Sequence, residues 1–377
     1  MKPAMRILIV GPAHPLRGGI AALNERLATA LGAAGHSAKI LSFRLQYPAF
    51  LFPGTSQYTT DPPPVGVEIA PLLNSVNPLN WLWYGLKYRR QEFDLVIFRF
   101  WLPFMGPCLG TVARLLALGR PIKVLAITDN LVPHEARPGD RWFTRYFLAG
   151  CTGFLAMSRA VLADLAQLAP TKPRVFSPHP VYDIYGAALP KAAARAKLGL
   201  DPQGRYLLFF GLIRAYKGLD LLLQAFADGV LRARGIRLII AGEFYESPEK
   251  YESLIQSLGL EDSIVRATRF IPNEEVANYF CAADLVVQPY KTATQSGVTQ
   301  IAYHFHKPMI VTDVGGLAET VPHGRAGYVV PVDPGQIAAA IIDFYDHHRE
   351  ETLINGMRAE ADQYAWATFV QQLLSLA

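Results

Sequence analysis

Short apolar runs alternate along the chain with segments in which apolar residues recur at helical spacing. The run MRILIVG at 5–11 predicts a buried strand, and Leu23, Leu27 and Leu31 predict a helix over 20–34. The same alternation predicts further strands at 38–43, 94–100, 122–128 and 153–158, and helices at 107–118 and 159–168. Strands separated by helices imply a parallel sheet with helices on both faces.

A second series of the same kind follows an interruption. Residues 175–205 carry several prolines and no long apolar run, and six more strands are then predicted, at 205–211, 237–243, 263–271, 284–290, 308–314 and 326–332. We therefore predict an α/β fold of two Rossmann-like, doubly wound parallel-sheet domains that face a cleft. The predicted domains are 1–182 and 205–362, with a linker at 183–204 and a final segment at 363–377.

Composition supports two large apolar cores. The 377 residues are 51% apolar and 18% charged, and no apolar run reaches the roughly 18 residues that span a bilayer. Because the first strand begins almost at the N-terminus, we expect no signal peptide and a cytoplasmic protein. Cys108, Cys151 and Cys281 lie far apart in apolar surroundings, which predicts buried thiols of a reducing compartment.

The charge is uneven between the two halves. Residues 1–182 hold 19 Lys+Arg and 9 Asp+Glu, net +10, and residues 183–377 hold 17 and 22, net −5, which together give the net charge of +5. A basic half suggests an anionic partner, either a membrane surface, a phosphorylated acceptor or a nucleic acid.

Glycines and cations follow the first strand of each half. Gly18 and Gly19, beside Arg17, join the first strand to the first helix, where backbone N–H groups can approach an anion. An ordinary turn is the alternative. The spacing does not fit G-x-G-x-x-G, so a nicotinamide dehydrogenase is not favoured.

Two cations follow the first strand of the second half. In FFGLIRAYKG, Arg214 and Lys217 come after a strand that ends at Gly211, where they can neutralise a diphosphate. The alternative is that they are two solvated charges before a helix.

Other polar residues end strands of the first half. Asp129, Asn130 and His134 follow the strand at 122–128, where they can contact a sugar or an acceptor hydroxyl or can form a polar turn. His179 fits either a site residue or a hinge residue bonded to backbone. The other histidines, His304, His306, His347 and His348, have no ligand-like partners in the sequence and predict packing or surface roles.

The segment WLWYGLKYRR at 81–90 interleaves aromatic and basic residues. Such a helix can lie in a membrane interface, or its aromatic residues can pack on the sheet while the basic end is solvated. Together with WLPF at 101–104 and the net charge of +10, it favours contact with a membrane or a lipid-linked acceptor.

The stretch YKTATQSGVTQIA at 290–302 lies between an apolar strand and a short helix and contains no acid. Backbone N–H groups of Ser296, Gly297 and Val298, at the predicted helix start, can receive a phosphate. The neutral side chains of Thr294, Gln295 and Ser296 can hydrogen-bond to sugar hydroxyls.

Read in order, these pieces resemble the two-domain glycosyltransferases of the GT-B fold, family 4. The resemblance covers nearly the whole chain, through FFGLIRAYKGLDLLLQAF, AGEFY, FIPNEEVANYFCAADLVVQPY, IVTDVGGLAETV with GYVVPVDP, the Gly18-Gly19 loop with its helix and GH turn, and YAWATF. It implies that Gly18, Gly19 and Gly211 lie near the donor phosphates. It also implies that Arg214 and Lys217 grip the donor diphosphate and stabilise the leaving group, and that 363–377 crosses back onto the first domain.

The chain departs from that family at its acids. Family members carry two glutamates where Ala293 and Ile301 stand here, and a histidine about where Asp129 stands. Glu319 matches a further family position that can face the nucleotide. Asp129, Arg214 and Lys217 are our candidate catalytic residues, and Arg17, Asn130 and His134 our candidate acceptor contacts. Ribose recognition must then be supplied differently, and attack assisted by the leaving phosphate does not require the lost carboxylate.

The resemblance implies a metal-independent hexosyltransferase that needs no cofactor. It would move a sugar from a nucleotide-diphosphate-sugar to a lipid-linked or oligosaccharide acceptor in bacterial cell-surface polysaccharide biosynthesis, with retention of configuration. The basic first half and the segment at 81–90 add the expectation of peripheral contact with the inner face of the plasma membrane. A GT-B epimerase, a phosphorylase and a non-catalytic sugar-nucleotide-binding or partner-binding relative are the alternatives. Nucleic-acid binding is not favoured, because no recognised binding motif is present.

Overall fold

The computed structural model describes residues 3–48, 56–59, 62–132, 138–227, 229–293 and 296–377. The chain divides into two compact units, one formed by Met1–Pro180 with Gln363–Ala377 and the other by Val181–Asp362. Of the predicted site residues, His134, Thr294 and Gln295 lie outside the described residues.

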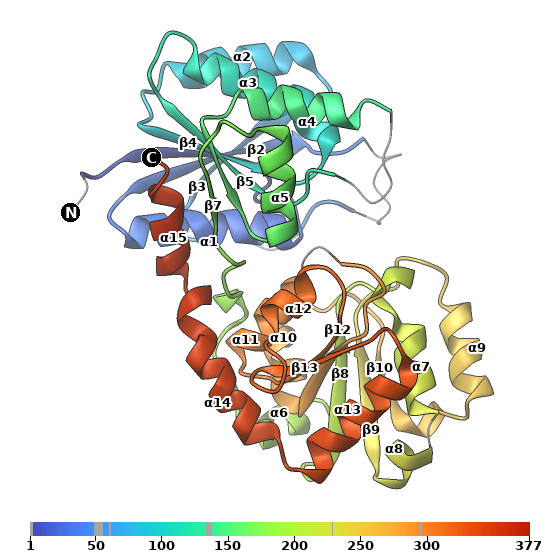
Figure 1. Ribbon diagram of the computed structural model, residues 1–377. Helices are drawn as coiled ribbons and strands as arrows, with labels where there is room; N and C mark the ends of the chain where they lie inside the picture. The colour runs from blue at the N-terminus through green and yellow to red at the C-terminus, as the bar shows by residue number, and fades with distance from the viewer. Residues whose placement is uncertain (1–2, 49–55, 60–61, 133–137, 228, 294–295) are drawn as a thin grey trace. The chain divides into compact units, whose positions relative to one another are not determined.

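The first unit is built on a seven-stranded parallel sheet (Figure 1). The strand order is β3-β2-β1-β4-β5-β6-β7. The strands are β1 (Arg6–Val10), β2 (Ser37–Leu45), β3 (Glu68–Asn74), β4 (Leu95–Phe100), β5 (Lys123–Thr128), β6 (Gly153–Ala156) and β7 (Arg174–Phe176). Every residue of β4 is buried, as expected of a central strand covered on both faces.

Two layers of helices cover this sheet. The connection from β1 to β2 runs along the sheet in the opposite direction to the connection from β4 to β5, so right-handed crossovers place their helices on opposite faces. In Figure 1, α2, α3 and α4 lie on one face, and α1 and α15 on the other. The helices are α1 (Gly19–Ala33), α2 (Pro78–Arg89), α3 (Gly106–Ala117), α4 (Asp140–Ala149), α5 (Arg159–Leu168) and α15 (Trp366–Leu374), with the 3₁₀ turn η2 (Pro103–Met105).

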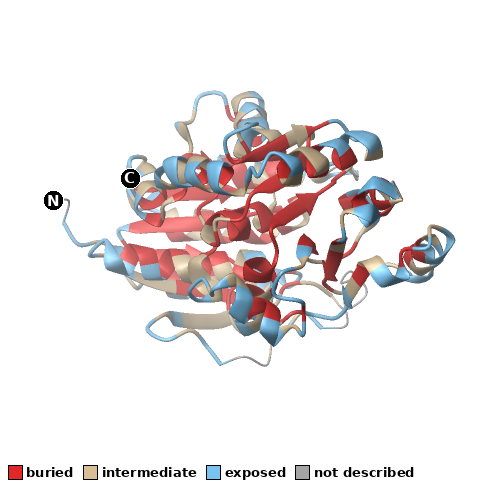
Figure 2. Ribbon diagram, turned by 90° about the horizontal axis from the view of Figure 1, so that it is seen from below, coloured by how far each residue is buried: buried red, intermediate tan, exposed pale blue. Residues whose placement is uncertain are grey.

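The second unit has a six-stranded parallel sheet in the order β10-β9-β8-β11-β12-β13. Its strands are β8 (Arg205–Phe210), β9 (Ile236–Ala241), β10 (Ile264–Ala267), β11 (Leu285–Gln288), β12 (Met309–Thr312) and β13 (Gly327–Val330). Each strand falls within a predicted apolar run, except that β9 begins one residue before the run at 237–243. Figure 2 shows buried residues along the strands and exposed residues on the outer sides of the helices. The predicted class, two doubly wound parallel-sheet α/β domains, is confirmed.

The helices of the second unit also form two layers, since α7, α8, α9 and α13 pack together and α6 packs on α10. They are α6 (Lys191–Lys197), α7 (Leu219–Phe226), α8 (Gly229–Ala233), α9 (Glu249–Ser257), α10 (Asn273–Ala282), α11 (Gly297–His304), α12 (Gly316–Thr320), α13 (Pro334–Asp346) and α14 (Glu350–Glu360). The 3₁₀ turns are η3 (Asp183–Tyr185), η4 (Ala215–Lys217), η5 (Glu261–Ser263) and η6 (Ala361–Tyr364).

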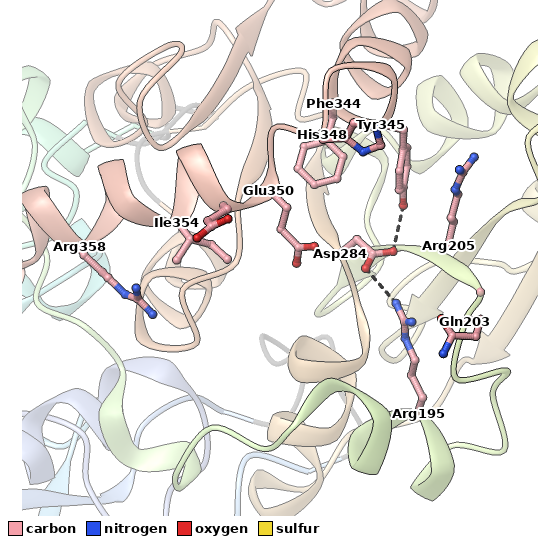
Figure 3. A pocket seen from close by; sticks show the side chains of 12 residues that line it. Arg195, Gln203, Arg205, Asp284, Phe344, Tyr345, His348, Glu350, Ile354 and Arg358 are labelled. Atoms are coloured by element: carbon pink, nitrogen blue, oxygen red, sulfur yellow. Dashed lines mark hydrogen bonds and ion pairs between the residues drawn. The ribbon is translucent and has the colours of Figure 1, made fainter.

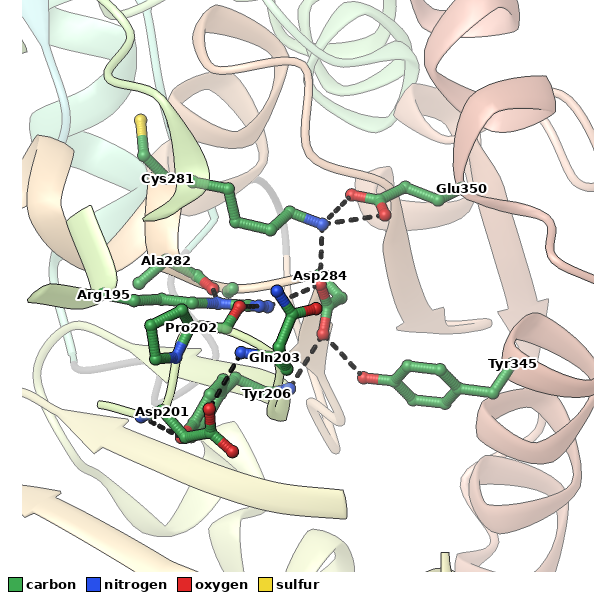
Figure 4. A network of polar contacts seen from close by, with 12 residues as sticks. Arg195, Asp201, Pro202, Gln203, Tyr206, Cys281, Ala282, Asp284, Tyr345 and Glu350 are labelled. Carbon is green, nitrogen blue, oxygen red and sulfur yellow. Dashed lines mark hydrogen bonds and ion pairs between the residues drawn. The ribbon is translucent and has the colours of Figure 1, made fainter. Parts of the chain in front are cut away.

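The segment 183–204, which we predicted as a linker, folds as part of the second unit. It contains η3 and α6, and a buried carboxylate attaches it to the sheet (Figure 4). Asp284, just before β11, accepts hydrogen bonds from Lys191 Nζ at 2.7 Å and Arg195 Nη2 at 2.8 Å. The backbone N–H of Tyr206 and the hydroxyl of Tyr345 donate to the other oxygen at 2.8 and 3.1 Å. Because these donors come from α6, β8 and α13, one side chain holds three parts of the unit together.

Candidate active site

In the second unit, the predicted phosphate residues meet where the strand order reverses. From β8 the chain moves to β9 on one side and later returns to β11 on the other, so the loops after β8 and β11 lead away from each other. Ligands of open parallel sheets bind in the crevice that such loops leave. Gly211, Arg214 and Lys217 follow β8, and Ser296 and Gly297 precede and begin α11 after β11.

The two loops contact each other where they leave the sheet, before the chain turns to opposite sides. The backbone N–H of Lys291 donates to the carbonyl of Tyr216 at 2.7 Å. A Cβ added to Gly218 would lie 1.9 Å from the carbonyl oxygen of Pro289, so only glycine permits this approach. A Cβ on Gly211 would lie 3.1 Å from Lys217 Nζ and 3.6 Å from Val298 Cγ2, so these residues share one small space.

Lys217 and Arg214 are cations that have aromatic neighbours and no acidic partner among the described residues. Lys217 is only 9% exposed, and burial lowers the pKa of its ammonium group. Its Nζ lies 5.5 Å from the ring centroid of Tyr290, and the guanidinium of Arg214 lies 4.7 Å from that of Tyr245. Arg214 Nε is buried without a hydrogen-bond partner in the part of the chain that the structure describes. The pair is therefore suited to a ligand that brings negative charge.

The start of α11 is held by a glutamine that the sequence did not single out. Gln288, at the end of β11, is 1% exposed. Its Oε1 accepts hydrogen bonds from Ser296 Oγ at 2.6 Å and Thr299 Oγ1 at 3.1 Å. The Ser296 hydroxyl, predicted to contact a sugar, thus positions the helix N-terminus, whose first N–H groups have no acceptor within a helix. The sequence signal that could have identified Gln288 is its position as a polar residue at the end of an apolar strand.

Two positions compared with the family pattern, Ile301 and Glu319, have different surroundings. Ile301, where the resemblance implies a glutamate, is buried in α11. Glu319 is exposed on α12, which follows β12, the neighbour of β11. It therefore lies at the same edge of the sheet as Arg214 and Lys217.

In the first unit, the predicted glycines and polar residues also lie at the carboxyl ends of the strands. Gly18 and Gly19 are exposed at the start of α1, after β1. The backbone N–H of Arg17 donates to the carbonyl of Gln57 at 3.0 Å. Asp129 and Asn130 directly follow β5 and are half-buried.

Asp129 forms a bidentate ion pair that was not predicted. Arg99 on β4 donates from Nε and Nη2 to the two carboxylate oxygens of Asp129 at 2.6 and 2.5 Å. Burial raises the pKa of Asp129, and the charge of Arg99 and its hydrogen bonds oppose that rise. Because Arg99 is 2% exposed, Asp129 neutralises a buried cation, and the catalytic role predicted for Asp129 stays a prediction.

The remaining candidates, His179 and the three cysteines, are buried. His179 is buried, its Nδ1 lies 2.8 Å from the carbonyl oxygen of Pro180, and burial lowers its pKa to about 4. Cys108, Cys151 and Cys281 are buried free thiols. Among the described residues, no cluster of three or more His, Cys, Asp or Glu side chains has a metal-binding arrangement.

A pocket of about 570 Å³ lies at the other end of the second sheet (Figure 3). Arg195, Arg205, Asp284, Tyr345 and Glu350 line it, near the amino ends of β8 and β11. Arg195 and Tyr345 each donate a hydrogen bond to Asp284, and Glu350 accepts one from Lys191. None of the predicted site residues lies there, and we do not assign it a ligand.

Solved structures of other proteins share the two-domain fold of this chain. Sucrose-phosphate synthase from Thermosynechococcus elongatus superposes with a TM-score of 0.74 at 18% identity, over 98% of each chain. An Anabaena protein, Alr3699/HepE, in complex with UDP superposes with a TM-score of 0.72 at 16% identity, over 98% of this chain and 99% of the other. These likenesses establish the GT-B fold that the sequence resemblance implied.

Sequence relatives lead to the family. Residues 204–347 match the family model of glycosyl transferases group 1. The D-inositol 3-phosphate glycosyltransferase of Streptomyces scabiei is 31% identical over 312 residues, 76% of this chain and 67% of the relative. That of Thermobispora bispora is 32% identical over 222 residues, 56% of this chain but only about half, 51%, of the relative. The chain belongs to the glycosyl transferases group 1 family, and the predicted class of enzyme, a glycosyltransferase, is confirmed at the level of the family.

Proposed function

We propose that this protein transfers a sugar from a nucleotide-diphosphate-sugar and that the second unit binds the donor. The observation that carries the proposal is the pair Arg214 and Lys217, without an acidic partner among the described residues, at the reversal of strand order. Two cations there can neutralise a diphosphate and stabilise it as a leaving group, so the proposed reaction needs no metal. The UDP in the Alr3699/HepE structure supports this class of donor.

The acceptor is proposed from charge. The first unit carries the net charge of +10, since 363–377 contains no charged residue, and a basic surface favours a phosphate-bearing acceptor. We propose a lipid-linked or oligosaccharide acceptor in cell-surface polysaccharide biosynthesis, with retention of configuration and with Asp129, Asn130 and Arg17 near the acceptor. The names of the relatives suggest a second acceptor of the same chemistry, an inositol phosphate.

Donor binding is tested by calorimetry with UDP, GDP and ADP and their glucose, galactose, mannose and N-acetylglucosamine conjugates. We expect one nucleoside diphosphate to bind, and Arg214→Ala with Lys217→Ala to weaken it by about 100-fold, the loss of two charge-assisted contacts of ~1.5 kcal/mol each. Lys250→Ala with Arg266→Ala removes the same charge from exposed positions of the second unit and is the matched control. Equal affinity of the two double variants would remove Arg214 and Lys217 from the site.

Transfer is tested with the donor so identified. Phosphorylated inositol and undecaprenyl-diphosphate-linked saccharides are offered separately, and the product anomer is determined by NMR. If the donor binds but neither acceptor class, nor water, receives the sugar, the non-catalytic alternative replaces this proposal. In an active enzyme the double variant loses at least ~3 kcal/mol of transition-state stabilisation, read from kcat/KM.

A further inference from the structure

Helix α2 packs onto the first unit by only one of its sides. Leu115 of α3 fills the space over Gly85, where an added Cβ would lie 2.7 Å from Leu115 Cδ1. Tyr88 is 2% exposed, and Trp81 donates from Nε1 to the carbonyl of Asn74 at 2.6 Å. These contacts fix which side of α2 faces the protein, and they confirm that part of the aromatic set packs inward.

The opposite side of α2 is apolar as well. Leu79 is 76% exposed and Trp83 67%, and Leu82 and Leu86 are exposed between and beyond them. Positions 79, 82, 83 and 86 follow the three- and four-residue spacing of a single helix face. A surface helix ordinarily carries polar residues on this side, so the exposed stripe indicates that something apolar covers it.

The exposed charges within α2 itself are basic. Lys87 and Arg90 are exposed at the C-terminal end of α2, and α2 contains no acidic residue. α3 lies between α2 and α4 in the same layer (Figure 1), since α4 contributes Tyr146 against Gly110 of α3. On α4, Trp142 is 64% exposed between the exposed Arg141 and Arg145. The outer side of the α2–α3–α4 layer thus combines exposed tryptophan and leucine with arginine and lysine.

We propose that the outer side of the α2–α3–α4 layer docks onto an anionic lipid bilayer. Leu79, Leu82, Trp83 and Leu86 enter the boundary between headgroups and acyl chains, and the basic side chains contact lipid phosphates. A second copy of this chain would bring two faces of the same positive charge together, which disfavours that occupant. The proposal is independent of the proposed function, because vesicle binding requires neither donor nor transfer.

The test is flotation of the purified protein with vesicles of phosphatidylcholine alone or with 30% phosphatidylglycerol. We expect binding to the anionic vesicles, weakened by 0.5 M NaCl, with a blue shift of tryptophan fluorescence and quenching by brominated acyl chains. Leu82→Gln with Trp83→Gln and Leu86→Gln should weaken binding at least tenfold, and Lys87→Gln with Arg90→Gln should weaken it and reduce its salt dependence.

The control variant replaces three exposed apolar residues of the second unit, Val230→Gln with Phe270→Gln and Val332→Gln, and should bind as the wild type does. Nucleoside-diphosphate affinity should be unchanged in every variant, which separates this proposal from the donor site. Absence of binding to anionic vesicles, or equal binding by the α2 variant and the wild type, overturns the proposal. Vesicle-independent dimers that the α2 variant abolishes would assign the stripe to a second copy instead.

Discussion

At the scale of single residues, the proposed donor site contains two cations, Arg214 and Lys217, that no carboxylate of the described residues neutralises. Lys217 is buried beside Tyr290, and Arg214 lies over Tyr245, with no carboxylate paired to either in the described chain. Burial of an unpaired ammonium costs free energy, so a structural role does not explain Lys217. Arg99 shows the contrast, since its buried guanidinium is neutralised by Asp129.

The lowered pKa of Lys217 predicts a pH dependence with a definite sign. Between that lowered pKa and about 10.4, the unfolded chain binds the proton that the native lysine has lost, so the native state gains stability as pH rises. Lys217→Met lacks this contribution. Urea unfolding at several pH values should show the stability of the wild type rising relative to Lys217→Met, while its affinity for the nucleoside diphosphate falls over the same range. If the free energies of unfolding of the wild type and Lys217→Met change with pH in the same way, Lys217 does not have a lowered pKa in the native state.

At the scale of elements, short connections rather than long helices bring the site together. The turn η4 ends at Lys217. Gly218, with φ of 68°, is the N-cap of α7 and lies against the carbonyl of Pro289 beyond β11. The site therefore depends on how closely the β8 and β11 loops approach.

Gly218→Ala should destabilise the protein more than its backbone conformation alone requires. Gly199 has nearly the same φ, 65°, with nothing within 4 Å of an added Cβ, and Gly199→Ala should cost ~1–2 kcal/mol. Gly218→Ala adds a clash with Pro289 and should cost at least ~2 kcal/mol more, with weaker diphosphate binding. Chemical denaturation and calorimetry measure the two effects. Similar losses of stability in both variants would show that the contact with Pro289 is dispensable.

At the scale of the whole molecule, the two α/β units carry net charges of opposite sign. Within the second unit, the carboxylate of Asp284 connects several elements. Asp284 joins α6, β8 and α13, while Lys191 also binds Glu350 of α14 at 2.7 Å. Arg195 is 4% exposed, so the loss of Asp284 leaves a buried cation without this partner.

Asp284→Ala should lower the free energy of unfolding by ~3–5 kcal/mol, the range found when one member of a buried ion pair is removed. Glu252→Ala, which breaks the exposed pair with Arg266 in the same unit, should change it by less than ~1 kcal/mol. Both are measured by urea unfolding at neutral pH. If the Asp284 variant is as stable as the Glu252 variant, the network does not stabilise the unit.

The sequence predicted some elements better than others for a physical reason. Long apolar runs such as MRILIVG and RLIIAGE mark buried parallel strands because both of their faces are covered. The strand Glu68–Asn74 was not predicted, since it is half-buried at the sheet edge and contains Pro71. Helix Asp140–Ala149 was also missed, because aromatic and basic residues interrupt its apolar spacing.

The sequence by itself determined two α/β halves, the glycosyltransferase resemblance, and the placement of Arg214 and Lys217 after a strand. These are properties of local pattern, set by apolar periodicity and motif spacing. Only the tertiary structure decided that Gln288 holds Ser296, that Asp129 binds Arg99, and which side of α2 faces outward. These features depend on which strands lie next to each other and on which side of a helix faces the sheet. The order of the strands and the packing of the helices determine them, and neither can be read from local sequence pattern. The stretch at 290–302 contains no acid, and the contact of Lys291 with Tyr216 joins it to the β8 loop that carries the two cations.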